Sequence, residues 1–304
     1  MIVSSGFNLL FRPGLRKDFR TEYNMYEPEW MQFLKSGTTS DEEGSATIFA
    51  YINRLYERGE GEPFIFTQPK IGPKVMWVNK EFAGGYQITK RAVLADKYNV
   101  LKTGAKQLAR AAQLTKEYRA GGFLDDLFTG TYYKGIDNLA FMSTAHTIIG
   151  SAGTTLSNKL STAVGLSMTS LTSMMDLFGQ LKDENNDPIK SWPTKIIIGN
   201  DAGNQNKIIQ LLGSQLEPFT ADNQDNPLKK RFSGLTPIVS RYMTNPRWYF
   251  LIDEKLNDMH LDVRVPLELR DWYDEYISAM LVSASEMYSL YGVDWRGWVG
   301  TNPT

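Results

Sequence analysis

The sequence predicts a folded protein that mixes helices and strands, and three observations indicate this class. Short β-favouring runs, punctuated by glycine and proline, occupy residues 47–91. One long amphipathic helical pattern follows them, and strand patterns dominate again over residues 261–300. At 304 residues, with 42% hydrophobic and 22% charged residues, the chain is long and apolar enough to bury one large core or two smaller ones.

Residues 1–45 combine a short apolar opening with a polar end. The run from Ser36 to Gly44 is acidic and rich in residues that interrupt regular structure, so it has little to bury. The residues leave two interpretations open. One is an extended or partly helical arm that becomes ordered against other parts, and the other is a frayed terminus.

Residues 47–91 predict a long two-stranded excursion with an irregular tip. Three short runs favour strands, and they cover residues 64–67, 75–78 and 86–89. Glycine and proline separate these runs, and the segment has too little apolar sequence for a core of its own. Because a hairpin without a core is marginally stable, we expect it to lie on another surface.

The clearest helix follows this excursion. Apolar residues recur at steps of three and four and form one stripe, which consists of Leu94, Tyr98, Leu101, Ala105, Leu108 and Ala112. Gly121 and Gly122 predict its C-terminal end, since glycine is the commonest residue there. A helix of about 25 residues would be about 38 Å long.

The rest of the chain predicts mixed helix and strand up to about residue 260 and strands beyond it. Helices are expected over 166–181 and 202–212, the second capped by Asp201, with a loop at 183–188 between them. The expected strands cover 195–199, 237–240, 248–252, 262–266 and 285–290.

Composition argues against several classes of protein. The net charge is −1, from 33 basic and 34 acidic residues, whereas proteins that grip nucleic acid carry an excess of Lys and Arg. The basic cluster at 229–231 is therefore interpreted as a solvated loop. The absence of cysteine excludes disulfides, thiolate catalysis and cysteine zinc sites. With no apolar run near the ~18 residues of a membrane span and no signal-peptide pattern, we expect a soluble protein made in the cytoplasm.

No constellation of residues predicts catalysis, a cofactor or a metal. The two histidines, His146 and His260, lack paired-ligand spacing, and we expect His146 to make structural hydrogen bonds. The motifs of a nucleophile elbow, a phosphate loop and a dinucleotide site are absent or incomplete. Residues 183–188 begin like a calcium loop but have proline where glycine is required, so they are interpreted as a surface turn.

Aromatic residues gather towards the C-terminus. Trp272 and Tyr276, with Trp295 and Trp298, could stack on the bases of a single nucleic-acid strand. The acidic residues that flank them would repel phosphates, and these are Asp271, Asp274, Glu275 and Asp294. Packing in the core or at a subunit interface is the preferred interpretation.

Short motifs follow one another in a distinctive order along most of the chain. They are Gly85–Thr89 before the long helix, Ser143–His146, Ser157-Asn158, Ala221–Asn223, Tyr242–Leu251 and Tyr291–Trp298. Each is weak alone, but their order and spacing resemble the major capsid proteins of tailed bacteriophages, in the branch of the Mu-like major head subunits. One departure is Thr147, which follows His146 where proline is expected.

The resemblance implies an α+β fold with discontinuous domains. It divides the chain into an N-terminal arm (1–45), an extended β-hairpin loop with flanking peripheral-domain strands (46–92), the spine helix of the peripheral domain (93–128), an axial α/β domain (129–262) and a return to the peripheral domain with the C-terminal segment (263–304).

The resemblance also implies a structural function. Copies would assemble in the host cytoplasm as pentamers and hexamers of an icosahedral head, touching the packaged DNA weakly and without sequence specificity, and without a membrane. Scaffold and portal proteins are expected partners, with decoration proteins a further candidate. Assembly contacts are expected from the loop and the arm, at Phe64, Phe66, Lys70, Lys74, Trp77, Phe82, Phe11 and Arg12. An isopeptide crosslink through a loop lysine is not expected, because nothing in the sequence indicates its activation.

Three alternatives stay open. The first is a decoration, vertex or encapsulating-shell protein of the same fold. The second is a nucleic-acid-binding module, which the small basic cluster and the aromatic residues would have to supply. The third is a hydrolase with an unrecognised site, which would need a perturbed residue in a pocket.

Overall fold

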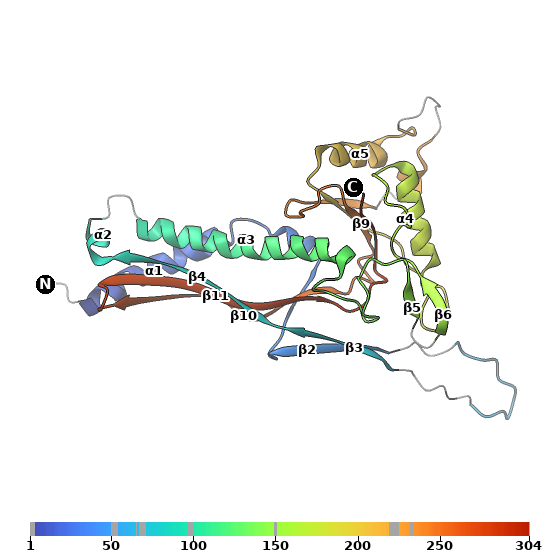
Figure 1. Cartoon of the computed structure of the whole chain (residues 1–304), viewed down its shortest axis with the longest axis horizontal. Coiled ribbons are helices and arrows are strands. Elements are labelled where there is room, and N and C mark those ends of the chain that lie inside the picture. The colour runs from blue at the N-terminus through green and yellow to red at the C-terminus, as the bar shows by residue number, and fades with distance from the viewer. Residues whose placement is uncertain are drawn as a thin grey trace.

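The computed structural model describes residues 4–49, 54–64, 66, 71–95, 100–148, 151–218, 225–231 and 234–303. The molecule is elongated and bent (Figure 1). A long lobe contains helix α3 (Val100–Thr129), and a second lobe contains α4 (Met168–Gln180) and α5 (Ala202–Gly213). A two-stranded ribbon projects from the long lobe and passes below the second lobe in this view.

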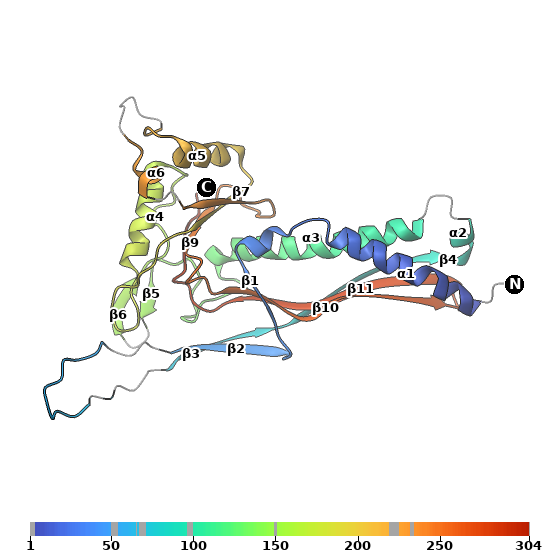
Figure 2. The ribbon, with the colours of Figure 1, turned by 180° about the vertical axis from the view of Figure 1, so that it is seen from behind.

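The long lobe is a four-stranded sheet with helices on one face. Its strand order is β1-β10-β11-β4, and α1 (Ser4–Tyr23) and α3 cover the same face (Figures 1 and 2). The strands are β1 (Lys35–Thr38), β4 (Lys80–Thr89), β10 (Met259–Asp274) and β11 (Ala279–Gly292). β11 pairs antiparallel with both β10 and β4, while β1 runs parallel to β10. The sheet thus joins the two ends of the chain, and the expected strands 86–89, 262–266 and 285–290 are confirmed within it.

Helix α3 continues through the two glycines that were predicted to end it, so that prediction was wrong. A Cβ at Gly121 would overlap the carbonyl oxygen of Tyr242, so this glycine permits close packing rather than termination. The helix ends at Thr129, and Gly130, which follows it, has a φ of 60°, a left-handed conformation that glycine adopts easily. The start also differs, because Thr89 caps a separate short helix, α2 (Lys90–Leu94). Tyr98 of the predicted stripe lies outside the described residues.

The N-terminal region packs on its own subunit. Leu15 and Phe19 of α1 are buried in clusters that include Ala105 and Ala109 of α3, two fully buried alanines that allow close approach. A 3₁₀ turn, η1 (Glu29–Gln32), follows and buries Trp30. The region that was predicted to be an arm therefore contains packed secondary structure.

The projecting ribbon differs in detail from its prediction. β3 (Ile71–Val78) pairs antiparallel with β2 (Glu43–Phe49), not with residues 64–67. Phe64 and Phe66 lie outside regular structure, and residues 65 and 67 are outside the described part. Gly44 belongs to the segment that was predicted to interrupt regular structure, but it lies in β2. There the Trp77 ring packs directly on its backbone, and a Cβ at this position would overlap that ring.

The second lobe carries a sheet with strand order β12-β9-β7-β8. Its strands are β7 (Lys195–Gly199), β8 (Thr236–Ser240), β9 (Tyr249–Ile252) and β12 (Trp298–Thr301), and the smaller elements are β5 (His146–Ile148), β6 (Ser151–Leu156) and α6 (Pro227–Arg231). The predicted helices and strands of this region are confirmed. Asp201 caps α5 as expected and accepts a hydrogen bond from Asn204 N at 2.9 Å.

One core connects the two lobes. The largest cluster of buried apolar side chains contains Phe123 and Leu127 of α3 together with Leu171 of α4, Ile197 of β7 and Trp298 of β12. Because these side chains belong to both lobes, the described residues form one packed unit with a projecting ribbon.

Candidate assembly surfaces and the buried polar junction

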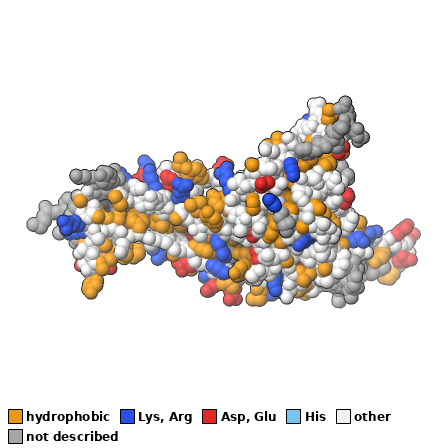
Figure 3. Space-filling view, turned by 45° about the horizontal axis from the view of Figure 1, so that its top comes forward, with side chains coloured by type: hydrophobic (Ala, Val, Ile, Leu, Met, Phe, Trp, Pro, Cys, Tyr) orange, Lys and Arg blue, Asp and Glu red, His pale blue; other side chains and the backbone are white. Residues whose placement is uncertain are grey.

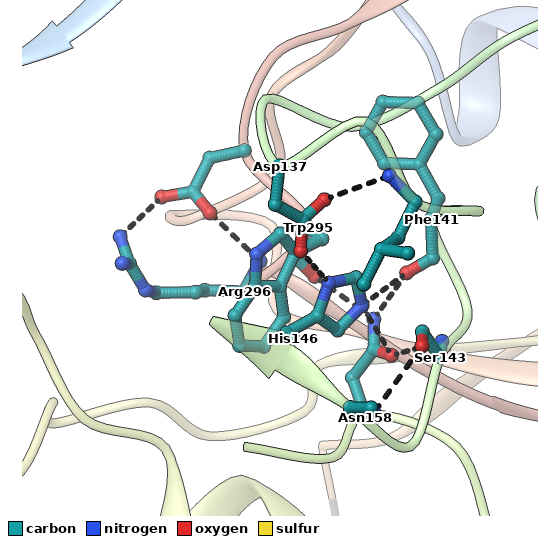
Figure 4. A network of polar contacts seen from close by, with 10 residues as sticks. Asp137, Phe141, Ser143, His146, Asn158, Trp295 and Arg296 are labelled. Carbon is teal, nitrogen blue, oxygen red and sulfur yellow. Dashed lines mark hydrogen bonds and ion pairs between the residues drawn. The ribbon is translucent and has the colours of Figure 1, made fainter. Parts of the chain in front are cut away.

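A buried polar network lies where the lobes meet, and His146 is at its centre (Figure 4). His146 Nδ1 is 2.5 Å from Asp137 Oδ2, and Nε2 is 3.1 Å from both the Phe141 carbonyl oxygen and Asn158 Oδ1. The imidazole stacks on Trp295 with ring centroids 4.0 Å apart. Burial alone would raise the pKa of Asp137, but the hydrogen bond and charge of His146 outweigh it and hold that pKa below its ordinary value.

Asn158 closes this network. Its side-chain nitrogen donates to the Phe141 carbonyl at 2.6 Å, and its side-chain oxygen accepts from Ser143 N at 2.9 Å. The Gly300 N–H donates to the Asn158 carbonyl at 2.9 Å, which ties β12 to the same point. Three motifs of the sequence, at 143–146, 157–158 and 291–298, therefore converge on one place. The buried groups bond to one another, which is the arrangement of a structural junction.

A buried ion pair adds the turn at 183–188 to this junction. Arg296 Nη2 lies 2.5 Å from Glu184 Oε1, and Nη1 lies 3.1 Å from Asp294 Oδ2. Burial would lower the pKa of Arg296, but the two carboxylates outweigh it and raise that pKa. No sequence pattern indicates a buried role for Glu184, because its partner is more than a hundred positions away and its neighbours are typical of a surface turn. The described residues contain no cluster of His, Asp and Glu able to hold a metal ion.

A second buried ion pair lies beneath α3. Lys116 Nζ is 2.6 Å from Glu286 Oε2 of β11 and 3.0 Å from the Tyr23 hydroxyl of α1. Burial raises the pKa of Glu286, and the nearby ammonium opposes this without cancelling it. The pair therefore joins both helices to the sheet and fixes their relative position.

The proposed assembly residues of the loop fall into two groups. Trp77 and Phe82 are partly buried against their own subunit, because Trp77 stacks on Tyr291 and Phe82 stacks on Tyr288, with ring centroids 3.5 and 4.4 Å apart. Large apolar side chains further along the loop are open to solvent, and these are Leu55, Phe64, Phe66 and Ile71. Such exposure predicts contact with a partner.

The remaining proposed loop and arm residues are placed as follows. Lys74 is exposed on β3, whereas Lys70 lies outside the described residues. Phe11 and Arg12 lie on α1, and nothing is described of their side chains. At the root of the loop, Arg54 contacts Asp187 through two nitrogens, one of them 3.0 Å from a carboxylate oxygen, so the loop is fastened to the 183–188 turn.

The four tryptophan and tyrosine residues near the C-terminus do not share one surface. Trp295 and Trp298 are fully buried in the core, where Trp298 Nε1 donates to Asn257 Oδ1 at 2.8 Å. Trp272 and Tyr276 lie exposed at the far end of the β10–β11 hairpin. A stacking platform built from all four is therefore excluded.

An elongated subunit with a projecting ribbon, exposed apolar residues and a polar junction sealed in its core has the features of a structural protein that contacts other chains. Residues 77–301 match the Phage capsid protein family, so the chain belongs to this family. It is a capsid structural protein of the virion and not an enzyme. No curated protein matches the sequence. Within the described residues, no helix is long and apolar enough to cross a membrane.

Solved structures share the fold at low sequence identity. A virus-like particle from Pyrococcus furiosus is 11% identical with a TM-score of 0.54, covering 95% of this chain and 98% of that one. The capsid of cyanophage P-SCSP1u is 11% identical with a TM-score of 0.56, covering 90% and 88%. The procapsid of bacteriophage JBD30 is 10% identical with a TM-score of 0.55, covering 99% and 77%. The expected α+β capsid fold, with α3 as its long helix, is confirmed.

Proposed function

We propose that this chain is the repeating subunit of an icosahedral phage head and that it assembles as pentamers and hexamers. The observation that carries the proposal is the surface of the isolated subunit. It exposes 17819 Å², whereas a compact monomer of this mass would expose about 13,000 Å². The excess follows from the elongated lobe and the ribbon, and it is area available for contacts between copies.

The ribbon and the loop supply the contacts that a closed shell needs. β2 and β3 form a sheet of two strands, each with one edge unpaired within that sheet, and such edges are suited to added strands. The apolar side chains at 55, 64, 66 and 71 are exposed in the lone subunit. Contacts of this kind between unlike surfaces generate rings, and rings of five and six together tile a shell.

Several finer assignments belong to the same proposal. The ordered motifs support a place among the Mu-like major head subunits. The division into arm, loop, spine helix, axial domain and returning segment follows from the same resemblance. We expect scaffold and portal proteins as partners. The net charge of −1 suits a wall that encloses DNA without gripping it.

A second candidate is an encapsulating shell of the same fold. The structural similarity of a virus-like particle over 95% of this chain supports this second candidate. The two candidates differ in their content, since a head contains DNA, whereas the contents of an encapsulating shell would be a cargo of another kind.

Electron microscopy and sedimentation of the purified chain test the proposal. Uniform hollow shells, or separate pentamers and hexamers, are the expected result. A compact monomer or dimer that also fails to assemble when a cognate phage scaffold is supplied would contradict it.

A further inference from the structure

The outer edge of strand β10 is open over most of its length. β10 lies between β1 and β11 in the sheet of the long lobe, but β1 pairs only with residues 260–263 of β10. Among the described residues, no strand pairs with the outer side of residues 264–274, and this stretch is called the open edge of β10 below. About half of its backbone N–H and C=O groups point away from the sheet, so the edge can accept a further strand.

Side chains of the open edge alternate between the two faces of the sheet. Leu267 and Leu269 pack against the buried cluster that α1, α3 and β11 share. Glu268, Arg270 and Trp272 are exposed. Because side chains at every second position of a strand lie on the same face, these three belong to the face away from the helices.

The open edge also restricts which strand can pair with it. Pro266 has no N–H to donate, and charged side chains on an edge strand act against pairing with an arbitrary strand. Figure 3 shows charges of both signs interspersed along the long lobe, so the net charge of this surface does not select a partner. The order of the charges along the edge can select one.

This order is complementary to itself. When two copies pair antiparallel about Leu269, Glu268 of each copy lies opposite Arg270 of the other copy. The same register places Arg264 of each copy opposite Asp274 of the other. Opposite charges that face each other across two strands stabilise the pairing, whereas like charges destabilise it.

Neighbouring registers bring like charges together. Only shifts that keep each side chain on its own face are allowed, because a slip by one residue exchanges the two faces. Pairing about Glu268 places this residue opposite its own counterpart, and pairing about Arg270 does the same with the guanidinium. Pairing about Leu267 places Arg264 opposite Arg270. The charges therefore favour the register about Leu269.

We propose that the open edges of β10 from two copies of this chain pair antiparallel about a twofold axis at Leu269. Pro266 of each copy then lies opposite the exposed Trp272 of the other, which adds an apolar contact. Such a contact is isologous and is complete with two copies, whereas contacts between unlike surfaces form rings. The inference rests on the proposed function, because it assigns the open edge to the contact that joins one ring to the next.

Disulfide trapping tests this contact, because the chain has no cysteine of its own. One copy carries Glu268→Cys and a differently tagged copy carries Arg270→Cys, and the two are co-assembled and oxidised. We expect a linked pair of the two tagged chains that a reductant releases, since directly opposite residues have Cβ atoms about 4.5–5.5 Å apart. The matched control replaces Glu268→Cys with Glu81→Cys, an exposed glutamate of β4 at the opposite edge of the same sheet, and we expect no such pair from it.

Charge reversal supplies the second arm. Glu268→Arg places two arginines opposite each other in both halves of the contact, and Arg270→Glu places two glutamates there. We expect each variant to form separate rings but no shells. Circular dichroism should show that both variants fold, since both side chains are exposed.

Mixing the two variants should restore the contact between unlike copies, because each arginine then lies opposite a glutamate of the other variant. Neither variant retains the Glu268–Arg270 ion pair of the lone subunit, so mixing separates the contact between copies from this internal pair. Sedimentation of the mixture measures the effect. We expect species larger than a single ring, which neither variant forms alone.

The outcomes separate this inference from the proposed function. Full shells from Glu268→Arg alone, or no trapped pair above the control in shells of the cysteine variants, would overturn the assignment of the open edge and leave the proposed function intact. Folded charge variants that form no rings would overturn it as well, because the edge would then act within a ring. If the unmodified chain forms neither rings nor shells even with scaffold, the proposed function fails, and the inference fails with it.

Discussion

At the scale of single residues, a buried carboxylate at the N-terminus of η1 makes stability depend on pH. Glu117 of α3 accepts a hydrogen bond from Glu29 N at 2.7 Å and lies near the Glu29 side chain. Burial raises the pKa of Glu117 to about 7, the backbone N–H groups oppose this, and the Glu29 carboxylate adds to it. Arg241 and Tyr242 face the same place from the segment after β8.

We therefore predict that the subunit loses stability as pH rises through about 7. The folded pKa is above the unfolded one, so this contribution is complete below the unfolded pKa and is lost at higher pH. Glu117→Gln keeps the acceptor oxygen without the charge and should raise the melting temperature at pH 8, with little change at pH 5. Thermal unfolding across pH measures this, and Glu57→Gln is the exposed control. The same pH slope in both proteins would show that Glu117 does not titrate in this range.

The Arg296–Glu184 pair gives a second prediction for single residues. Arg296→Met leaves the fully buried Glu184 side chain without its guanidinium. Removing one partner of a buried pair costs about 3–5 kcal/mol. Adding Glu184→Leu removes the stranded charge and should recover part of that loss. Urea unfolding of the unassembled subunit measures both, and additive losses in the double variant would rule out this account.

At the scale of elements, local patterns predicted what local forces determine. Helices α4 and α5 were expected because periodic apolar residues and capping side chains lie within a few positions of one another. The packing role of Gly121 was not expected, because a glycine that ends a helix and a glycine that packs against Tyr242 look the same in the local sequence. The pairing of β3 with β2 and the convergence of 143–146 with 291–298 also depend on distant residues. The order of the motifs along the chain indicated the family, but the contacts between them at the junction could be known only from the three-dimensional structure.

The two adjacent glycines of α3 make a matched test of this distinction. Alanine favours a helix interior over glycine by up to about 1 kcal/mol. Gly122 has open space around its missing Cβ, so Gly122→Ala should stabilise the subunit by roughly this amount. At Gly121 the Tyr242 carbonyl fills that space, so Gly121→Ala should destabilise it by about 1–3 kcal/mol despite the better propensity. Urea unfolding midpoints of the two variants should shift in opposite directions, and a shared direction would refute the packing role of Gly121.

At the scale of the whole molecule, folding and assembly depend on different parts of the chain. The core that joins the lobes draws on α3, α4 and the second sheet. The loop beyond the ribbon contributes exposed side chains at 55, 64 and 66. Ile71 at the start of β3 is 71% exposed and pairs with Phe49 of β2, so the ribbon can be closed there with loss of the exposed Arg54–Asp187 contact and with the cores of both lobes intact.

We predict that replacing residues 50–70 with a short Gly–Ser linker gives a folded subunit that does not form stable shells. The Phe49–Ile71 pairing supplies the ends of a shorter hairpin, and β4 remains paired with β11, so the melting temperature should change little. Loss of the exposed apolar side chains of the loop removes contacts between copies, so sedimentation should show subunits or small rings under conditions in which the full chain forms shells. A linker of the original length made of Gly and Ser separates the loss of side chains from the loss of reach. Stable particles of normal size from both variants would show that the loop has no part in assembly.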